Sequence, residues 1–185
     1  NKENNNFFIG KILNINISNI SDVKNSNLYQ ILYICTKLNN PSIPKLIGFS
    51  LIEYKNEIKP IIITEMIQNG TLKDLLQLEK QKGFNSQLSQ TKKLIIIYGI
   101  ALGMKIMHSK LIIHRNLNPS SILFDESYYP KISRLESCVS IHERLYFNSD
   151  PIGETVYNAP EVLKSQKYTK ASDVYAFSMI VYEIV

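Results

Sequence analysis

The 185-residue chain has no tryptophan, only two cysteines and only seven glycines. The cysteines, Cys35 and Cys138, cannot form a disulfide framework of the kind that holds small secreted domains together, so a reducing compartment is expected. The longest apolar run, Leu94–Met104, is shorter than the roughly 20 residues that a membrane-spanning helix needs. We therefore expect a cytoplasmic protein that has no membrane partner.

Charge and hydrophobicity are those of an ordinary globular protein. Hydrophobic residues make up 44% of the chain, charged residues make up 20%, and the formal net charge is +5. The lysines and arginines are scattered, and Thr91–Lys93 is the nearest approach to a cluster, so no nucleic-acid partner is expected. The length fits one domain with a substantial core or two small lobes.

The first third of the chain reads as mostly strands. Partial alternation of apolar and polar residues predicts a strand at Ile12–Ser18, and two more strands are predicted at Lys45–Tyr54 and Lys59–Ile67. Between them, Asn27–Leu38 has apolar residues at helical spacing, and Pro41 would stop a helix there. We expect a sheet accompanied by one helix.

The rest of the chain reads as mostly helices. Thr71, with Asp74 three positions later, predicts the N-cap of one helix. A long helix is predicted at Thr91–Lys110, apolar on nearly all sides and therefore buried. A final apolar helix is predicted to begin at Ser172 or Asp173. Two short strands are expected between these helices, in "SILF" and "PKIS".

Six stretches of the sequence together indicate a protein family, although each of them alone would not. They occur in one order and at ordinary spacing: "LNNPSIPKLIGFS", "IIITEMIQNGTLKDLL", "IIHRNLNPSSILFD", "YPKISRLES", "GETVYNAPEVL" and "SDVYAFSMIVYEI". Together they resemble a protein kinase domain, and they are most similar to the tyrosine-kinase-like group of Ser/Thr kinases. The resemblance begins near Asn27 and runs to the end of the chain.

The resemblance implies an α+β, two-lobed fold of the protein-kinase type that is only partial. Residues 1–66 would form a small β-rich N-lobe with helix αC and without a Gly-rich loop. Residues 67–185 would form a C-lobe from helix αD to helix αF, without helices αG to αI. Both ends are expected to be cuts, so that the sequence stops within αF.

The resemblance places uncharged residues where the family's catalytic loop has charged or metal-binding ones. Asn116 stands at the position of the catalytic Asp, and an amide is not basic near neutral pH. Loss of a general base typically costs roughly 10²–10⁴ in rate. Asn118 replaces the loop's lysine, and Ser121 replaces the Asn that holds a second magnesium ion.

The family's nucleotide site is altered as well. Arg134 stands where the magnesium-binding Asp belongs, and a guanidinium repels a divalent cation. Arg134 is expected to be solvated or paired with Glu136, and neutralisation of a phosphate is a further alternative. The position of the αC glutamate falls on Ile31, and Asn16 is the expected counterpart of the ATP-binding lysine.

Other positions keep the residue types that the family uses for packing. The gatekeeper and hinge would be Thr64, Glu65 and Met66, and Leu123 would pack under an adenine ring. Four further residues match structural positions of the family: His114, Arg115, Glu161 and Asp173. No metal site is expected from the three histidines.

Three hypotheses follow. The first is a catalytically inactive pseudokinase that acts by protein–protein interaction, with another kinase as one candidate partner and without a cofactor. The second is a weak or unconventional Ser/Thr protein kinase that binds ATP and Mg²⁺. The third is a degenerate, non-functional gene copy.

Overall fold

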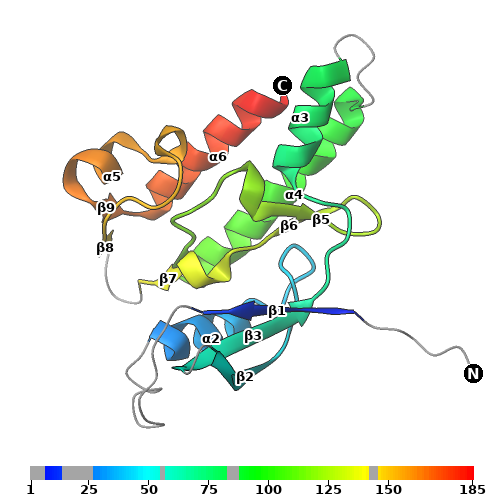
Figure 1. Ribbon diagram of the computed structural model, residues 1–185. Coiled ribbons are helices and arrows are strands. Elements are labelled where there is room, and N and C mark those ends of the chain that lie inside the picture. The colour runs from blue at the N-terminus through cyan, green and yellow to red at the C-terminus, as the bar shows by residue number, and fades with distance from the viewer. Residues whose placement is uncertain (1–6, 14–26, 55–56, 83–87, 142–145) are drawn as a thin grey trace, which may run out of the picture.

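The computed structural model describes residues 7–13, 27–54, 57–82, 88–141 and 146–185 (Figure 1). In this part of the chain an antiparallel sheet and one helix come first and mostly helices follow, which confirms the α+β class. The sheet and its helix lie at one end of the molecule, and the longer helices lie at the other (Figure 1). The lobe boundary after residue 66 stays a prediction.

The N-terminal sheet has three antiparallel strands in the order β1-β3-β2. They are β1 (Phe8–Ile12), β2 (Leu46–Tyr54) and β3 (Glu57–Glu65). The apolar, mostly β-branched run of β3 suits a central strand. The predictions for β2 and β3 are confirmed to within two residues at each end. The strand predicted at Ile12–Ser18 lies mostly outside the described residues, and the described strand β1 precedes it.

One helix, α2 (Asn27–Lys37), packs beside the sheet. Its buried residues Leu28 and Ile34 belong to the same apolar core as Ile62 of β3. The helix ends ahead of Pro41, as predicted. The core extends without interruption into the helical part of the chain, so the sheet and the helices share one apolar interior.

The next two helices, α3 (Leu72–Lys82) and α4 (Gln90–Ser109), begin at residues that cap them. Before α3, the Asp74 backbone N–H donates to Thr71 Oγ1 over 3.1 Å, and the Thr71 backbone N–H donates to Asp74 Oδ2 over 2.9 Å. This reciprocal pair is a capping box, which confirms the predicted N-cap. At α4, the Ser89 side chain accepts from the Lys92 backbone N–H.

The prediction that α4 is buried on nearly all sides is wrong for one face. Ile100 and Met107 are fully buried, but Leu94 and Tyr98 are 66% and 69% exposed. The apolar composition does not distinguish the two faces. Within the described residues, α4 packs chiefly against the strand Pro130–Ile132 and against the last helix.

Short elements connect α4 to the last helix. Pairs form between β4 and β7, between β5 and β6, and between β8 and β9, and the two predicted strands in "SILF" and "PKIS" are confirmed as β5 and β6. The elements, in chain order, are β4 (Ile112–Ile113), η2 (Pro119–Ser121), β5 (Ile122–Phe124), β6 (Pro130–Ile132), η3 (Leu135–Ser137), β7 (Val139–Ser140), β8 (Phe147–Asn148), η4 (Thr155–Tyr157), α5 (Pro160–Ser165) and β9 (Lys167–Tyr168).

The last helix, α6 (Lys170–Ile184), begins earlier than predicted. Its N-cap is Thr169, whose side chain accepts from the Ser172 backbone N–H, while the Ser172 hydroxyl accepts from the Thr169 backbone N–H. The start predicted at Ser172 or Asp173 is therefore wrong, because Ser172 closes a capping box at the third helical position. No helix among the described residues is long and apolar enough to span a bilayer.

Gly99 of α4 lets the helix approach β6 closely, and we expect Gly99→Ala to destabilise the protein. An added Cβ would lie 2.4 Å from Cγ of Pro130, whose ring cannot move aside. Overpacking of this kind typically costs about 1–3 kcal/mol, which exceeds the helix-propensity gain of about 1 kcal/mol for alanine. Urea unfolding measures the change. Leu102→Ala, on the exposed face of the same helix, is the control, and an unchanged or higher stability of Gly99→Ala would contradict the packing.

Candidate functional site

A buried carboxylate on α6 holds the loop that follows β4. Asp173 Oδ2 accepts from the His114 backbone N–H over 2.8 Å, and Asp173 Oδ1 accepts from the Arg115 backbone N–H over 3.0 Å. The His108 Nε2 atom, at the end of α4, lies 2.9 Å from Asp173 Oδ2. One side chain thus joins α4, the loop and α6, and Arg115 is held at a positive φ of 67°.

His114 is completely buried and is held in one tautomer. Its Nε2 donates to the Ser133 carbonyl over 2.8 Å, and its Nδ1 accepts from the Asn116 backbone N–H at 3.3 Å. Burial lowers the pKa of His114 below its ordinary value, against the opposing charge of Asp173. The imidazole is therefore a neutral spacer between the loop and the strand that ends at Ile132.

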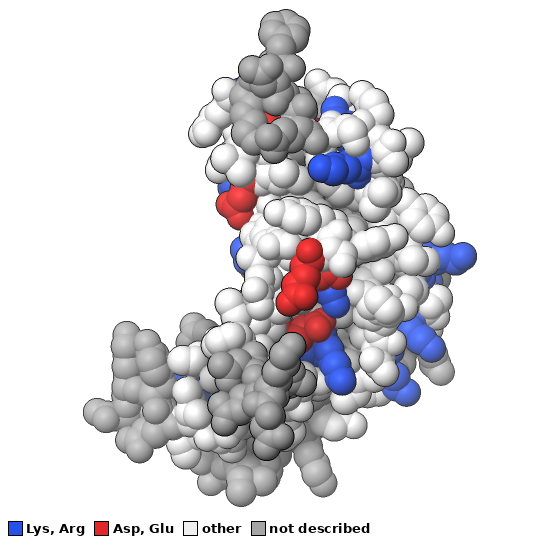
Figure 2. All heavy atoms as spheres, turned by 90° about the vertical axis from the view of Figure 1, so that its right-hand side faces the viewer, with Lys and Arg blue, Asp and Glu red and all other residues white. Residues whose placement is uncertain are grey.

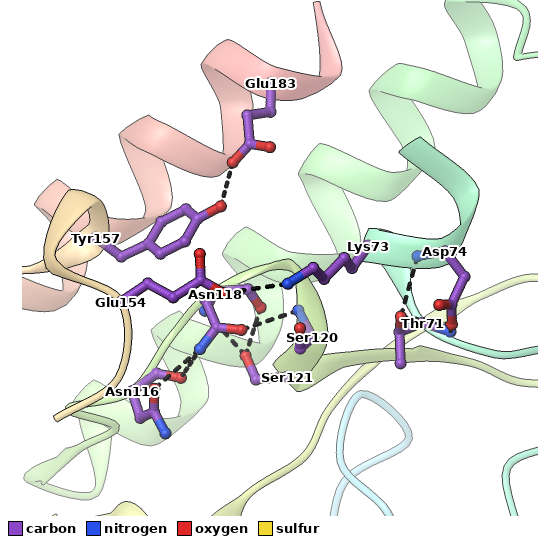
Figure 3. A network of polar contacts seen from close by, with 10 residues as sticks. All are labelled: Thr71, Lys73, Asp74, Asn116, Asn118, Ser120, Ser121, Glu154, Tyr157 and Glu183. Carbon is purple, nitrogen blue, oxygen red and sulfur yellow. Dashed lines mark hydrogen bonds and ion pairs between the residues drawn. The ribbon is translucent and has the colours of Figure 1, made fainter. Parts of the chain in front are cut away.

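The predicted catalytic-loop positions Asn116, Asn118 and Ser121 lie together and bond to one another (Figure 3). Asn118 Nδ2 donates to Asn116 Oδ1 over 2.9 Å and to the Asn116 carbonyl over 3.0 Å. The Ser121 hydroxyl donates to the Asn118 carbonyl and accepts from the Asn118 backbone N–H. Asn118 and Ser121 are buried, so these groups mainly stabilise the loop itself.

The segment before α5, which includes Gly153 and Glu154, packs against this loop. Gly153 has a φ of +77°, and a Cβ there would lie 2.4 Å from Asn116 Oδ1. The next residue, Glu154, is bridged to Lys73 of α3 at 3.2 Å, and the Tyr157 hydroxyl donates to the Glu183 carboxylate on α6 (Figure 3). The Asn116 amide thus faces backbone and other amides.

Arg134, at the predicted magnesium-binding position, is exposed. Arg134 adopts a left-handed conformation at φ 60° before η3, and no ion pair joins it to an acid among the described residues. The expected alternative of an Arg134–Glu136 pair is wrong, because Glu136 pairs with Lys11 of β1.

Lys11 is the residue that sequence reasoning missed. The strand pairing puts Lys11 opposite Ile62, two residues before the gatekeeper position Thr64, and its Nζ contacts the Glu136 carboxylate. Asn16, the predicted counterpart of the ATP-binding lysine, lies outside the described residues. The available signal was a lysine inside the apolar run "FIGKI". It was missed because the strand was predicted at Ile12–Ser18, just after this lysine.

The αC-glutamate position, Ile31, is buried in α2 and belongs to the apolar core. It lines one cavity of about 430 Å³ together with Glu136, Arg115 and Phe147. At this position the helix therefore has an apolar side chain and not a carboxylate.

The predicted gatekeeper and hinge positions end strand β3. Thr64 is half-buried opposite Ile9, and Met66 is exposed. Glu65 accepts from Lys131 Nζ over 2.8 Å and from the Lys45 backbone N–H over 2.9 Å. Partial burial alone would raise the pKa of Glu65, but these two bonds, with the charges of both lysines, lower it below its ordinary value.

The remaining predicted positions are placed as follows. Leu123, half-buried in β5, pairs with Lys131 and forms a bridge with Thr71. The Arg115 side chain donates from Nε to the Ser137 carbonyl over 2.6 Å and lies over the Phe147 ring at 4.9 Å. Glu161 is exposed in the first turn of α5, and no described residue forms an ion pair with it.

The predicted catalytic-loop and metal positions carry neutral and cationic side chains. Asn116, Asn118 and Ser121 offer amides and a hydroxyl, and Arg134 offers a guanidinium. None of these is a carboxylate that could bind a hard divalent cation. Among the described residues no group of three or more His, Cys, Asp or Glu side chains could hold a metal ion.

The chain belongs to the protein tyrosine and serine/threonine kinase family, whose sequence model matches residues 11–185. That match includes Lys11 at its start. The resemblance inferred from the six stretches is therefore confirmed at the level of the family.

Curated relatives carry kinase names. The chain is 33% identical over 157 residues to the cysteine-rich receptor-like protein kinase 11 of Arabidopsis thaliana, a match that covers 82% of this chain and 22% of the relative. It is 33% identical over 162 residues to the serine/threonine-protein kinase VIK of the same plant, covering 82% and 34%. With the dual specificity protein kinase pyk3 of Dictyostelium discoideum it shares 32% over 125 residues, covering 68% and 9%. The chain spans between 8% and 34% of the length of the curated relatives it matches.

Removal of the Asp173 carboxylate should be among the most destabilising single changes. Asp173→Ala leaves two buried backbone N–H groups without an acceptor, and hydrogen bonds to charged groups contribute about 1.5–3 kcal/mol each. We expect unfolding in urea to lose at least about 3 kcal/mol. Glu126→Ala, at an exposed residue, is the control. If Asp173→Ala lost no more stability than the control variant, the loop would not depend on α6.

The depressed pKa of His114 predicts an acid-dependent stability. Its folded pKa lies below the unfolded value of 6.5, so its contribution is fully present above pH 6.5 and is lost as pH falls towards the folded pKa. In an NMR titration of the imidazole C–H signals His114 should titrate below 6.5, and His114→Gln should lessen the fall in urea stability as the pH drops below 6.5. A His114 signal that titrates at 6.5 would contradict this.

Proposed function

We propose that this chain is a pseudokinase domain: a catalytically inactive member of its family that acts through protein–protein interaction. The observation that carries the proposal is the closed network of Asn116, Asn118 and Ser121 at the catalytic-loop positions. Asn116 cannot accept a substrate proton, and its side-chain oxygen already accepts from Asn118.

The metal position supports the same proposal. Phosphoryl transfer in this family depends on Mg²⁺ held by carboxylate and amide oxygens. Arg134 offers a positive charge at that position, and Ser121 uses its hydroxyl within the loop. Arg134 would repel a Mg²⁺ ion at the position where the family's residues attract it.

The proposal includes a finer assignment of the fold. The sheet β1-β3-β2 with α2 would be the N-lobe, residues 1–66, with α2 as helix αC. Residues 67–185 would be the C-lobe, with α3, α4 and α6 as helices αD, αE and αF. Lys11 would be the counterpart of the ATP-binding lysine, and the six stretches favour the tyrosine-kinase-like group.

One observation favours the alternative, a weak or unconventional protein kinase that binds ATP. Lys11 lies in the strand next to the gatekeeper strand, and its Nζ contacts Glu136, two residues after the predicted metal position Arg134. Its partner there is Glu136, not an acid of α2. This alternative keeps one phosphate contact but no base and no metal ligand, so the pseudokinase assignment has the stronger support.

A protein is the proposed partner, in the cytoplasm, with another kinase as the first candidate. Exposed apolar side chains on α4 and α6 offer a surface of the kind that proteins cover: Leu94, Tyr98, Val174 and Tyr182. On the face shown in Figure 2, blue side chains lie apart from one another and do not merge into a basic patch. This scatter speaks against a nucleic-acid partner on that face.

Thermal denaturation with and without ATP and Mg²⁺ tests the proposal. A ligand at about 100 times its Kd adds about 2.7 kcal/mol, or roughly 5–10 °C for a domain of this size. We expect no magnesium-dependent shift. The control variant Arg134→Asp supplies a metal-binding carboxylate and is expected to show a larger shift than the parent. A clear magnesium-dependent rise in the parent would overturn the pseudokinase assignment and favour the enzyme.

A further inference from the structure

A cavity of about 600 Å³ lies between α3, α4 and the turn that joins β5 to β6. Small-molecule sites typically have volumes of about 300–1,000 Å³. Among the described residues, none of those at the predicted catalytic, magnesium, hinge or adenine positions lines this cavity. It is therefore a second hollow, separate from the candidate site at the catalytic loop.

Most of the cavity lining is apolar. Leu88, Ile96 and Phe124 are at most 9% exposed and form its inner wall. Leu78 and Ile95 also line it, but they are 51% and 40% exposed. An apolar group that fills the hollow would remove these two side chains from water, which favours binding.

One end of the cavity is acidic and aromatic. The Phe124 backbone N–H donates to the Gly70 carbonyl over 3.1 Å, which places β5 beside the start of α3. Asp74, in the first turn of α3, lines this end. Its Oδ2 atom accepts from the Thr71 hydroxyl over 2.7 Å and from the Thr71 backbone N–H over 2.9 Å, and these bonds lower the pKa of Asp74. The cavity thus holds a charged carboxylate together with the rings of Phe124 and Tyr128, whose centroids are 6.3 Å apart.

The other end of the cavity carries one charge of each sign. The Leu88 backbone N–H donates to Glu79 Oε2 over 3.4 Å, so the second half of α3 lies next to the start of α4. Lys92, in the first turn of α4, lines the cavity together with Glu79. The charges of Lys92 and Glu79 cancel, so the lining has the net negative charge of Asp74.

We propose that this cavity binds a small amphiphilic amine, with its cationic group at the Asp74 end and its apolar body against Leu78 and Ile95. The carboxylate attracts a cation directly, and the face of an aromatic ring such as that of Tyr128 attracts it as well, so both groups favour the same charge. This site does not depend on the pseudokinase assignment, because it uses none of the residues on which that assignment rests.

Isothermal titration calorimetry with three probes of similar shape tests the preferred charge. The probes are phenylbutylamine, phenylbutanol and phenylbutyrate. The amine is expected to bind about two- to fivefold more tightly than the alcohol, as is typical of an exposed charge pair, and the carboxylate should bind most weakly. The advantage of the amine should shrink at high salt. Equal binding of the three probes, a preference for the carboxylate, or no saturable binding of the amine would overturn the proposal.

Variants of Asp74 show whether the charge preference is local. Asp74→Asn keeps a side-chain acceptor for Thr71 and should remove the advantage of the amine, while the alcohol still binds. Asp74→Glu keeps the charge and should keep the advantage. Glu161→Gln makes the same change in net charge as Asp74→Asn at an exposed position on α5, and it should leave the order of the probes unchanged. An advantage of the amine that persists in Asp74→Asn would overturn the proposal.

Two further variants keep the proposal testable if Asp74→Asn does not fold. Ile95→Asn should weaken binding of the amine and of the alcohol, whereas Leu102→Asn, on the same helix and outside the cavity, should not. Tyr128→Leu should lower the affinity for the amine more than the affinity for the alcohol. Equal binding by Ile95→Asn and Leu102→Asn, or an unchanged advantage of the amine in Tyr128→Leu, would overturn the assignment of the cavity.

Discussion

The hydrogen bonds of the Asp173 carboxylate are the constraint on which the site depends. The loop after β4 must turn back on itself through Arg115, a non-glycine residue at φ 67°, which is a conformation that costs energy unless the surroundings impose it. Asp173 imposes it by accepting from two consecutive backbone N–H groups. Once the loop is fixed, the positions of Asn116, Asn118 and Ser121 follow, since they are neighbours in sequence and close on one another.

Two residues that shape the loop, Asp173 and His114, are distinct from those at the predicted catalytic and metal positions. Groups that shape the loop are present: the anchor Asp173, the neutral spacer His114 and the cap Asn118. The positions predicted for the family's catalytic and metal-binding groups hold amides, a hydroxyl and the guanidinium of Arg134. Asn118 shows how the replacement stabilises the loop, since an amide can both donate to Asn116 and accept from the Ser120 backbone N–H, which a lysine cannot.

The sequence was most informative where a local pattern decides the outcome. Strand β3 and helix α4 are long apolar runs, and the Thr71–Asp74 cap needs only four residues, so each could be predicted. The Lys11–Glu136 pair could not, because it forms across 125 residues and no periodic pattern connects its members. The exposed face of α4 was missed for a related reason. An apolar composition indicates that a helix can be buried, but the elements packed against it determine which face is buried.

The Glu65–Lys131 pair has a mechanical consequence. Glu65 is the last residue of the sheet's central strand, and Lys131 belongs to β6, which packs on α4. Any rocking of the sheet against the helices must stretch this bond, which lies beside the single covalent connection between β3 and α3. Because Lys131 is only 12% exposed, dissolved ions screen the pair weakly. The end of β3 is thus fixed to β6 beside the point where the chain passes from the sheet to α3.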